Sequence, residues 1–100
     1  MPDKSIDLVL ADSILIDTPP LLTSKIIGEF ARIARKGFIF LEWHTENQHI
    51  AQGNRWVYNY RQLLNSALPG AELAFIKLPP TLWGGPWGDH GYLILAKIPL

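Results

Sequence analysis

Two short polar segments carry the side chains best suited to chemistry. Ala11-Asp12-Ser13 ends one apolar run, and Glu42-Trp43-His44 ends another. Ligands of open α/β sheets bind beyond the carboxyl ends of parallel strands. If the two runs are neighbouring parallel strands joined by a right-handed connection, both segments lie side by side and can line one ligand site.

Each polar side chain in these segments has a chemical and a structural interpretation. The Asp12 carboxylate could hydrogen-bond a ligand, or it could satisfy loop amides at the end of a strand. Ser13 fits a backbone contact or a helix cap better than a direct ligand contact. Glu42 could line the site, although a glutamate at a strand end is often only solvated. His44 is the best candidate for a general base because histidine titrates near neutral pH, and the alternative is an ordinary loop histidine.

A second group of candidates is aromatic. Trp83, Trp87 and Tyr92 lie in or beside a loop that contains Gly84-Gly85. These rings could wall a substrate pocket, and aromatic loops also bind carbohydrates or peptides. The alternative is that the tryptophans cover the edge of the sheet.

Hydrophobic periodicity predicts the elements that position these side chains. Strands are expected where apolar runs end at polar or turn residues, and helices where apolar residues recur every three or four positions. The expected order is β-α-β-α-β-β, with strands at 6–11, 38–43, 72–78 and 91–98 and helices at 19–36 and 59–67. The first two strands are expected to be parallel. The last two are joined only by a loop, which predicts a C-terminal antiparallel hairpin.

Two stretches predict how the strands are covered and connected. The run Leu8–Ala11 is continuously apolar, which is typical of a strand covered on both faces. Residues 44–55 are polar and predict an irregular loop. A loop of this length is more often functional than idle.

Both ends of the first helix can be assigned from residue types. Thr18 is a suitable cap, and Pro19 suits the first helical position. Arg32, Arg35 and Lys36 are expected in the last turn, where the helix dipole favours cations. Gly37 is then the expected helix terminator.

The composition describes one small globular domain without a strongly charged surface. Of 100 residues, 48% are hydrophobic, and nine Lys and Arg balance nine Asp and Glu. A formal charge of zero gives no reason to expect nucleic acid or an anionic membrane as a partner, and with this much apolar surface it favours association. There is no cysteine, the histidines lack the spacing of a metal site, and no apolar run approaches a membrane span. We therefore expect no metal, no membrane contact and a cytoplasmic location.

The element order and four local motifs resemble the second half of a class I S-adenosylmethionine-dependent methyltransferase domain. Sheets of this family close with an antiparallel hairpin after the last helix. The motifs are similar to the start of the family's fourth strand, the segment after it, the end of the next helix and the aromatic start of the following one: Asp3–Val9, Ala11–Ser13 with Leu15-Ile16, Glu29–Gly37, and Trp56, Tyr60, Leu63 and Leu64. One departure is Lys36-Gly37, which stands where Lys-Pro-Gly is commoner.

The resemblance implies a fold, a cofactor and site residues. The fold is α/β, a partial Rossmann-like methyltransferase sheet that makes one domain of residues 1–100. The cofactor is S-adenosylmethionine, and the residues implied to bind it are Ala11, Asp12 and Ser13. The residues implied to bind the unknown methyl acceptor are Ile16, Glu42, Trp43, Trp83 and Trp87. The candidate catalytic base for such a transfer remains His44, which its residue type suggests.

The family's glycine-rich first loop and the acidic residue that ends its second strand have no counterpart here. That loop approaches the methyl donor with its backbone. The resemblance therefore implies a fragment of a longer protein, methyl transfer only within a longer chain or complex, and weak or absent donor binding by this chain alone.

Without its first half, the strand at 6–11 is expected to have a free edge. This edge is open to the N-terminal half or to self-association. The alternative function is accordingly a non-catalytic α/β interaction module that pairs through this strand. A third interpretation is a hydrolase using Asp12 and His44, which the absence of a G-x-S-x-G motif disfavours.

Overall fold

The computed structural model describes residues 2–47, 49–51, 55–82 and 84–99. Its strands are β1 (Ile6–Asp12), β2 (Ala34–Trp43), β3 (His49–Ala51), β4 (Arg55–Val57), β5 (Glu72–Lys77) and β6 (Gly91–Lys97). Its helices are α1 (Pro20–Ile33), α2 (Tyr60–Ala67) and α3 (Pro86–His90), with a short 3-10 turn at Leu15–Asp17. Within this described part, no helix is both long and apolar enough to span a membrane.

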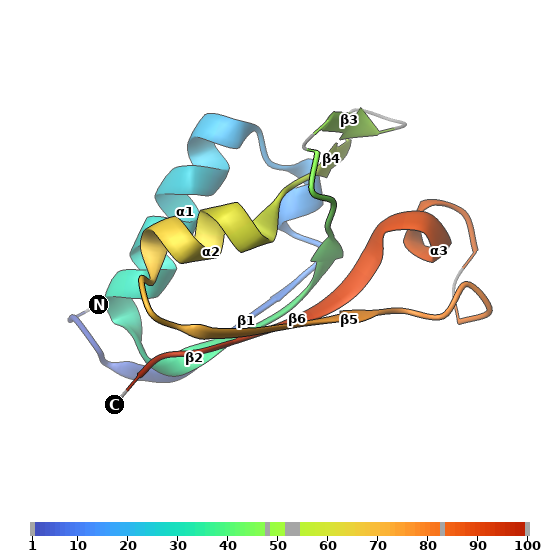
Figure 1. Cartoon of the computed structure of the whole chain (residues 1–100). Coiled ribbons are helices and arrows are strands. Elements are labelled where there is room, and N and C mark those ends of the chain that lie inside the picture. Colours follow the sequence, from blue (N-terminus) through green and yellow to red (C-terminus); the bar gives the residue numbers. More distant parts are fainter. Residues whose placement is uncertain (1, 48, 52–54, 83, 100) are drawn as a thin grey trace.

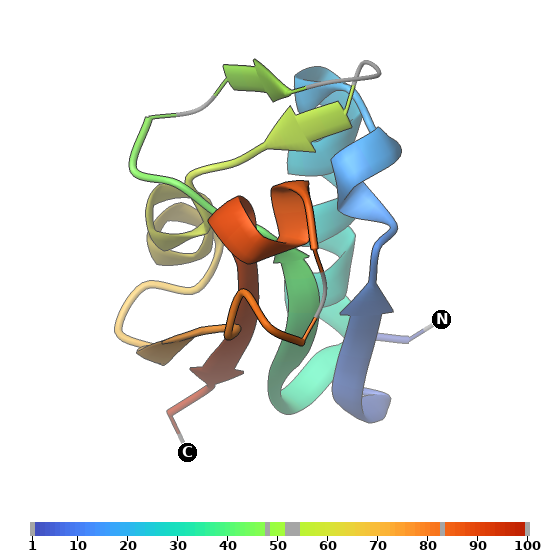
Figure 2. The ribbon, with the colours of Figure 1, turned by 90° about the vertical axis from the view of Figure 1, so that its right-hand side faces the viewer.

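Four strands form one mixed sheet in the order β1-β2-β6-β5 (Figures 1 and 2). β1 and β2 are parallel, and β6 is antiparallel to both β2 and β5. β1, β2 and β5 therefore run in the same direction, with β6 inserted against them. The predicted α/β class, parallel first pair and C-terminal hairpin are confirmed.

Helices α1 and α2 lie on the same face of this sheet, where the main core forms (Figure 1). Alternate strand residues such as Phe38, Phe40 and Ile94 point into this core and are almost fully buried. The rings of Phe38 and Phe40 stack with their centroids 5.3 Å apart. Ile27 of α1 and Leu64 of α2 close the core from the helical side.

The expectation that β1 is covered on both faces is wrong. Val9 and Ala11 are buried, but Leu8 and Leu10 are 49% and 69% exposed on the other face. The reason lies in the connections. Both α1 and α2 join strands that follow one another in the same direction across the sheet, and right-handed crossovers then place both helices on one face.

The predicted ends of the first helix are also wrong. α1 ends at Ile33 with Arg32 in its last turn, as predicted, whereas Arg35 and Lys36 are exposed residues of β2. Arg35 instead forms an ion pair with Asp7 of the neighbouring strand, with an N···O distance of 2.5 Å. At the other end, Pro19 occupies the cap position and Pro20 is the first helical residue, so no side chain caps the helix. The Thr18 hydroxyl instead donates to the carbonyl of Ile14 at 2.9 Å.

Regular structure also appears where loops were expected. Within residues 44–55, part of the chain forms the short antiparallel pair β3 and β4, and the Trp- and Gly-rich loop contains α3. By contrast, α2 was predicted correctly. Its capping residue is Asn59, whose side chain accepts a hydrogen bond from the backbone N–H of Gln62 at 3.1 Å.

Gly37 is required by the sheet rather than by a helix end. A Cβ at this position would overlap the backbone carbonyl oxygen of Ala96 on β6. We predict that Gly37→Ala lowers the free energy of unfolding by roughly 1–3 kcal/mol, as overpacking does. Urea unfolding of the purified chain measures this change.

Gly28 provides the matched control. It lies in the middle of α1, and a Cβ there would meet no atom within 4 Å. Gly28→Ala should therefore raise the free energy of unfolding by about 0.5–1 kcal/mol through helix propensity alone. Equal effects of the two substitutions would contradict the close approach of β2 to β6.

Candidate functional site

The two polar segments meet at the carboxyl ends of β1 and β2. Asp12 is in register with Leu41, and the N–H of Ser13 donates to the carbonyl of Leu41 at 2.9 Å. Ala11-Asp12-Ser13 and Glu42-Trp43-His44 therefore lie at the same edge of the sheet, as their order along the chain predicts.

The chain turns sharply at Ser13. Its φ of 58° lies in the left-handed region, which costs a non-glycine residue on the order of 1 kcal/mol or more. The Ser13 hydroxyl donates to Oδ1 of the exposed Asp12 at 2.9 Å. This turn leads the chain back over the end of β2, so that the next backbone amides face Glu42.

Glu42 holds the loop that follows β1. Its side chain is fully buried. Oε2 accepts hydrogen bonds from the N–H groups of Ile14 and Leu15 at 3.1 and 3.3 Å, and Oε1 accepts one from Ile16 at 3.3 Å. Glu42 is therefore neither a solvated strand end nor a side chain open to an acceptor. It positions the loop, including the predicted substrate residue Ile16.

The Glu42 carboxyl titrates near neutral pH. Burial raises its pKa to about 7. The three backbone N–H groups oppose this rise because they stabilise the charged form, and the nearby Asp12 carboxylate adds to it. The loop next to the candidate ligand site is consequently held by a group whose charge changes in the physiological range.

Three predicted substrate residues come together in a second, smaller core. Ile16, Trp43 and Trp87 pack there with Val57. The Trp43 ring is fully buried, and the edge of Trp87 meets it with a centroid distance of 5.7 Å. Trp83 lies outside the described residues.

Trp43 also has features that the sequence pattern did not indicate. The Arg55 guanidinium lies 5.9 Å from the centre of its ring, and Arg55 also pairs with Asp17 at 3.6 Å. Only the position of Arg55 at the end of a polar loop could have suggested this. Among the described residues, the buried Trp43 Nε1–H has no hydrogen-bond acceptor, and the burial of the ring keeps this donor out of reach of a ligand.

His44 belongs to a different environment. Its Nδ1 accepts the backbone N–H of Tyr60 at 3.1 Å. The ring packs against Phe75 and Tyr92, with centroid distances of 4.5 and 5.1 Å. Burial lowers its pKa, although the Glu46 carboxylate opposes this shift. In the neutral imidazole, the Nδ1 lone pair is therefore engaged by the Tyr60 N–H. His44 can accept a proton from a substrate only if this hydrogen bond opens.

A hollow of about 440 Å³ lies beside His44. Its wall mixes charges from Glu46, Arg61 and Asp89. In the part of the chain that the structure describes, no three His, Cys, Asp or Glu side chains gather as metal ligands would. Phe75 and Tyr92 add aromatic surface to the same wall, so the hollow combines charged and apolar contacts.

Glu42 should make the stability of the fold depend on pH. Its pKa is about 7 in the folded chain against an ordinary value of 4.5, so between these values the folded state holds a proton that the unfolded state has released. The free energy of unfolding should therefore fall as pH rises through this window, by roughly 3 kcal/mol at about 1.4 kcal/mol per pKa unit. Glu42→Gln should remove this fall, which urea unfolding at a series of pH values measures.

Glu72→Gln is the matched control because Glu72 is an exposed carboxylate on β5. The lowered pKa of His44 makes the free energy of unfolding rise with pH, which opposes the effect of Glu42. This contribution is present in the native chain and in both variants, so it cancels when their curves are compared. Parallel curves for the native chain and Glu42→Gln would show that Glu42 is not the titrating group.

Comparison of the chain with protein-family models, with curated proteins and with solved structures finds no match. Its function is therefore inferred from its own sequence pattern, sheet order and side-chain geometry.

Proposed function

We propose that this chain is the C-terminal half of a class I methyltransferase domain with a Rossmann-like sheet. In this proposal it takes part in S-adenosylmethionine-dependent methyl transfer when an N-terminal half is supplied. The observation that carries the proposal is the strand order β1-β2-β6-β5, with the antiparallel β6 inserted beside strands of one direction. It agrees with the hairpin that closes the family's sheets. The expected compartment stays the cytoplasm.

The geometry of the β1 end supports a donor site at Ala11-Asp12-Ser13. Asp12 is exposed, and Ser13, with a positive φ, turns the chain back over the end of β2. The Asp12 carboxylate can therefore accept hydrogen bonds from the amine of the donor's methionine end. Glu42 supports this loop because its carboxylate accepts hydrogen bonds from three backbone N–H groups of the loop. In this proposal Glu42 positions the loop and does not contact the methyl acceptor.

The acceptor side is proposed at the aromatic cluster beyond β2. Trp87 of α3 is the partly exposed member of that cluster, and Trp83 precedes it by four residues in the sequence. Methyl transfer is an in-line displacement, which needs donor and acceptor held at close range more than it needs a catalytic group. A base is needed only where the acceptor must lose a proton. His44 fills that role in the proposal only when its bond to Tyr60 opens.

A second candidate function is a non-catalytic interaction module. The observation that favours it is the position of β1 at the edge of the sheet. Its free backbone groups can pair with a strand of another chain. In the methyltransferase proposal the same edge receives the N-terminal half. Donor binding at the end of β1 separates the two functions.

The test is a titration of the isotope-labelled chain with S-adenosylmethionine, followed by NMR. We expect weak binding, with a dissociation constant of about 1–10 mM because half of the donor's contacts are missing. Amide shifts should be confined to residues 11–16, and Asp12→Ala should abolish them. Glu72→Ala, which removes a carboxylate at the opposite end of the sheet, should leave them unchanged.

Two outcomes would sink the methyltransferase proposal. One is a spectrum that does not change at millimolar donor. The other is a set of shifts that lies elsewhere or persists in Asp12→Ala. Either result would leave the interaction module as the better explanation of the sheet.

A further inference from the structure

The hollow of about 440 Å³ beside His44 lies away from the proposed donor site, and we call it the His44 hollow. The donor site is at the end of β1, which is one edge strand of the sheet. The hollow is lined from β6 and from β5, which is the opposite edge strand. Its other walls come from α2, α3 and the segment that follows β2 (Figure 1). What this hollow binds is therefore a separate question from donor binding.

Two aromatic rings contribute to the wall of the His44 hollow. Phe75 of β5 and Tyr92 of β6 are half-buried, and their ring centroids are 6.5 Å apart. The Arg61 guanidinium lies 4.3 Å from the centroid of Phe75. The Lys77 ammonium lies 5.9 Å from the centroid of Tyr92. Because aromatic faces attract cations electrostatically, this wall suits a positively charged group.

The charged side chains of the lining leave one carboxylate unbalanced. Glu46 and Asp89 contribute carboxylates, and Arg61 contributes a guanidinium. Arg61 Nε lies 3.1 Å from Glu46 Oε1, so these two charges compensate each other. Asp89 is exposed, and its carboxylate has no hydrogen bond or ion pair with any other described residue. With its histidines neutral, the hollow therefore carries one net negative charge, which lies at Asp89.

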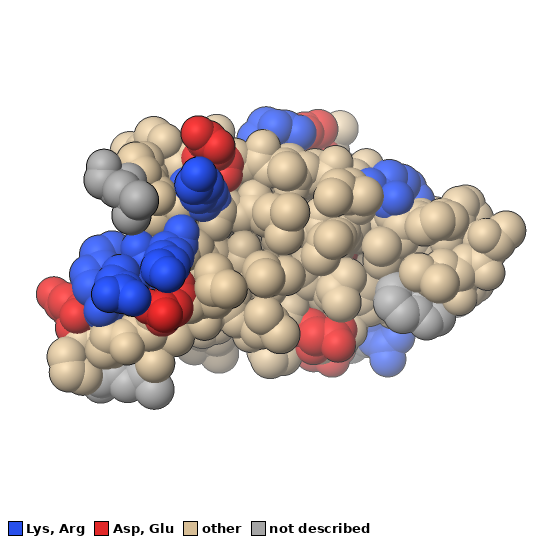
Figure 3. Space-filling view, turned by 90° about the horizontal axis from the view of Figure 1, so that it is seen from below, with Lys and Arg blue, Asp and Glu red and all other residues tan. Residues whose placement is uncertain are grey.

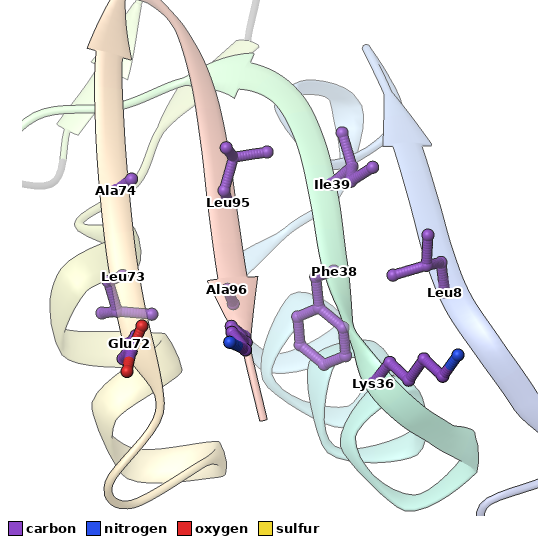
Figure 4. Close-up of a pocket in the computed structure, with 10 residues that line it drawn as sticks. Leu8, Lys36, Phe38, Ile39, Glu72, Leu73, Ala74, Leu95 and Ala96 are labelled. Atoms are coloured by element: carbon purple, nitrogen blue, oxygen red, sulfur yellow. The ribbon is translucent and has the colours of Figure 1, made fainter. Parts of the chain in front are cut away.

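The hollow on the face of the sheet opposite the helices has a different character. It has a volume of about 430 Å³, and its lining is mainly aliphatic (Figure 4). Its charged members are Lys36, Lys97 and Glu72. Figure 3 shows this face from below, with few charged side chains in its middle. Two ammonium groups against one carboxylate disfavour a cationic ligand there, so the charge of a ligand should distinguish the two hollows.

We propose that the His44 hollow binds a small organic cation, which is an ammonium group carried on an apolar body. The ammonium group pairs with the Asp89 carboxylate. The apolar body packs against the accessible parts of the Tyr92 and Phe75 rings. The volume of the hollow lies in the lower part of the range of small-molecule sites, which is about 300–1,000 Å³.

Other classes of ligand fit this lining less well. An organic anion would lie near the unpaired Asp89 carboxylate, and it would have to compete with Glu46 for the Arg61 guanidinium. A bare metal ion needs several oxygen or nitrogen ligands. No three His, Cys, Asp or Glu side chains of the described residues gather in that way. A neutral aromatic molecule could use the rings but would gain nothing from Asp89.

NMR titration of the isotope-labelled chain with 2-phenylethylammonium tests the proposal at about pH 7.5, where ordinary histidines are mostly neutral. We expect a dissociation constant of about 1–10 mM for so small a ligand. Amide shifts should appear at residues 44–46 and 89–92. The matched ligands are 2-phenylethanol, which lacks the charge, and 3-phenylpropionate, which reverses it. The alcohol should bind at least about threefold more weakly, as the loss of an exposed ion pair predicts, and the carboxylate should bind more weakly still.

A substitution at Asp89 tests the assigned contact. Asp89→Asn should weaken the binding of the ammonium at least about threefold and bring it to the level of the alcohol. The binding of 2-phenylethanol itself should not change. Glu72→Gln is the control, because it removes an exposed carboxylate that lines the other hollow, and it should leave both ligands unaffected. Asp89 has no described partner, so its substitution should preserve the fold, which circular dichroism checks.

Three results would overturn the proposal. The first is equal binding of the ammonium and the carboxylate ligand, or no binding of either at millimolar concentration. The second is an Asp89→Asn variant that still prefers the ammonium to the alcohol. The third is a set of shifts confined to residues 8, 39, 74 and 95, which would place the ligand in the other hollow. The donor titration is read at residues 11–16 instead, so either proposal can fail while the other stands.

Discussion

The direction in which the chain winds is the constraint on which the rest of the structure depends. β1, β2 and β5 run in one direction and follow one another across the sheet, so α1 and α2 cover the same face. The core then forms on that side alone. The strand β1 keeps a free edge, and the opposite face keeps its leucines exposed. A small domain buries a modest fraction of its surface in any case, and here that fraction is concentrated on one side of the sheet.

The sequence predicted the strands and their directions because apolar runs and short connections act locally. Whether helices cover both faces of β1 depends on the order and direction of all the strands, so it could not be predicted from Leu8–Ala11 alone. A continuous apolar run has the same appearance whether its second face meets a helix of the same chain or another surface. The end of α1 was predicted too late for a related reason. Gly37 fits a helix terminator locally, but the close approach of Ala96 from the far end of the chain determines its place.

The candidate site was predicted in position and less well in contacts. The carboxyl ends of β1 and β2 meet because parallel neighbours end at one edge, which element order alone indicates. The contacts of each side chain depend on which face of the sheet its residue occupies. Glu42 turns into the fold and binds three amides, and His44 turns toward α2 and binds Tyr60. Neither preference follows from residue type. The exposed Asp12 is consequently the group at this edge best placed to meet a ligand.

The free edge of β1 and the exposed leucines behind it are two consequences of the same winding. Strands that continue the sheet beyond β1 lie on the side of β1 away from β2, so the chain steps across them in the direction opposite to the step from β1 to β2. Right-handed crossovers between such strands place their connecting helices on the face opposite α1 and α2, where Leu8 and Leu10 are exposed. The proposed N-terminal half would therefore pair with the free edge and cover these leucines at the same time.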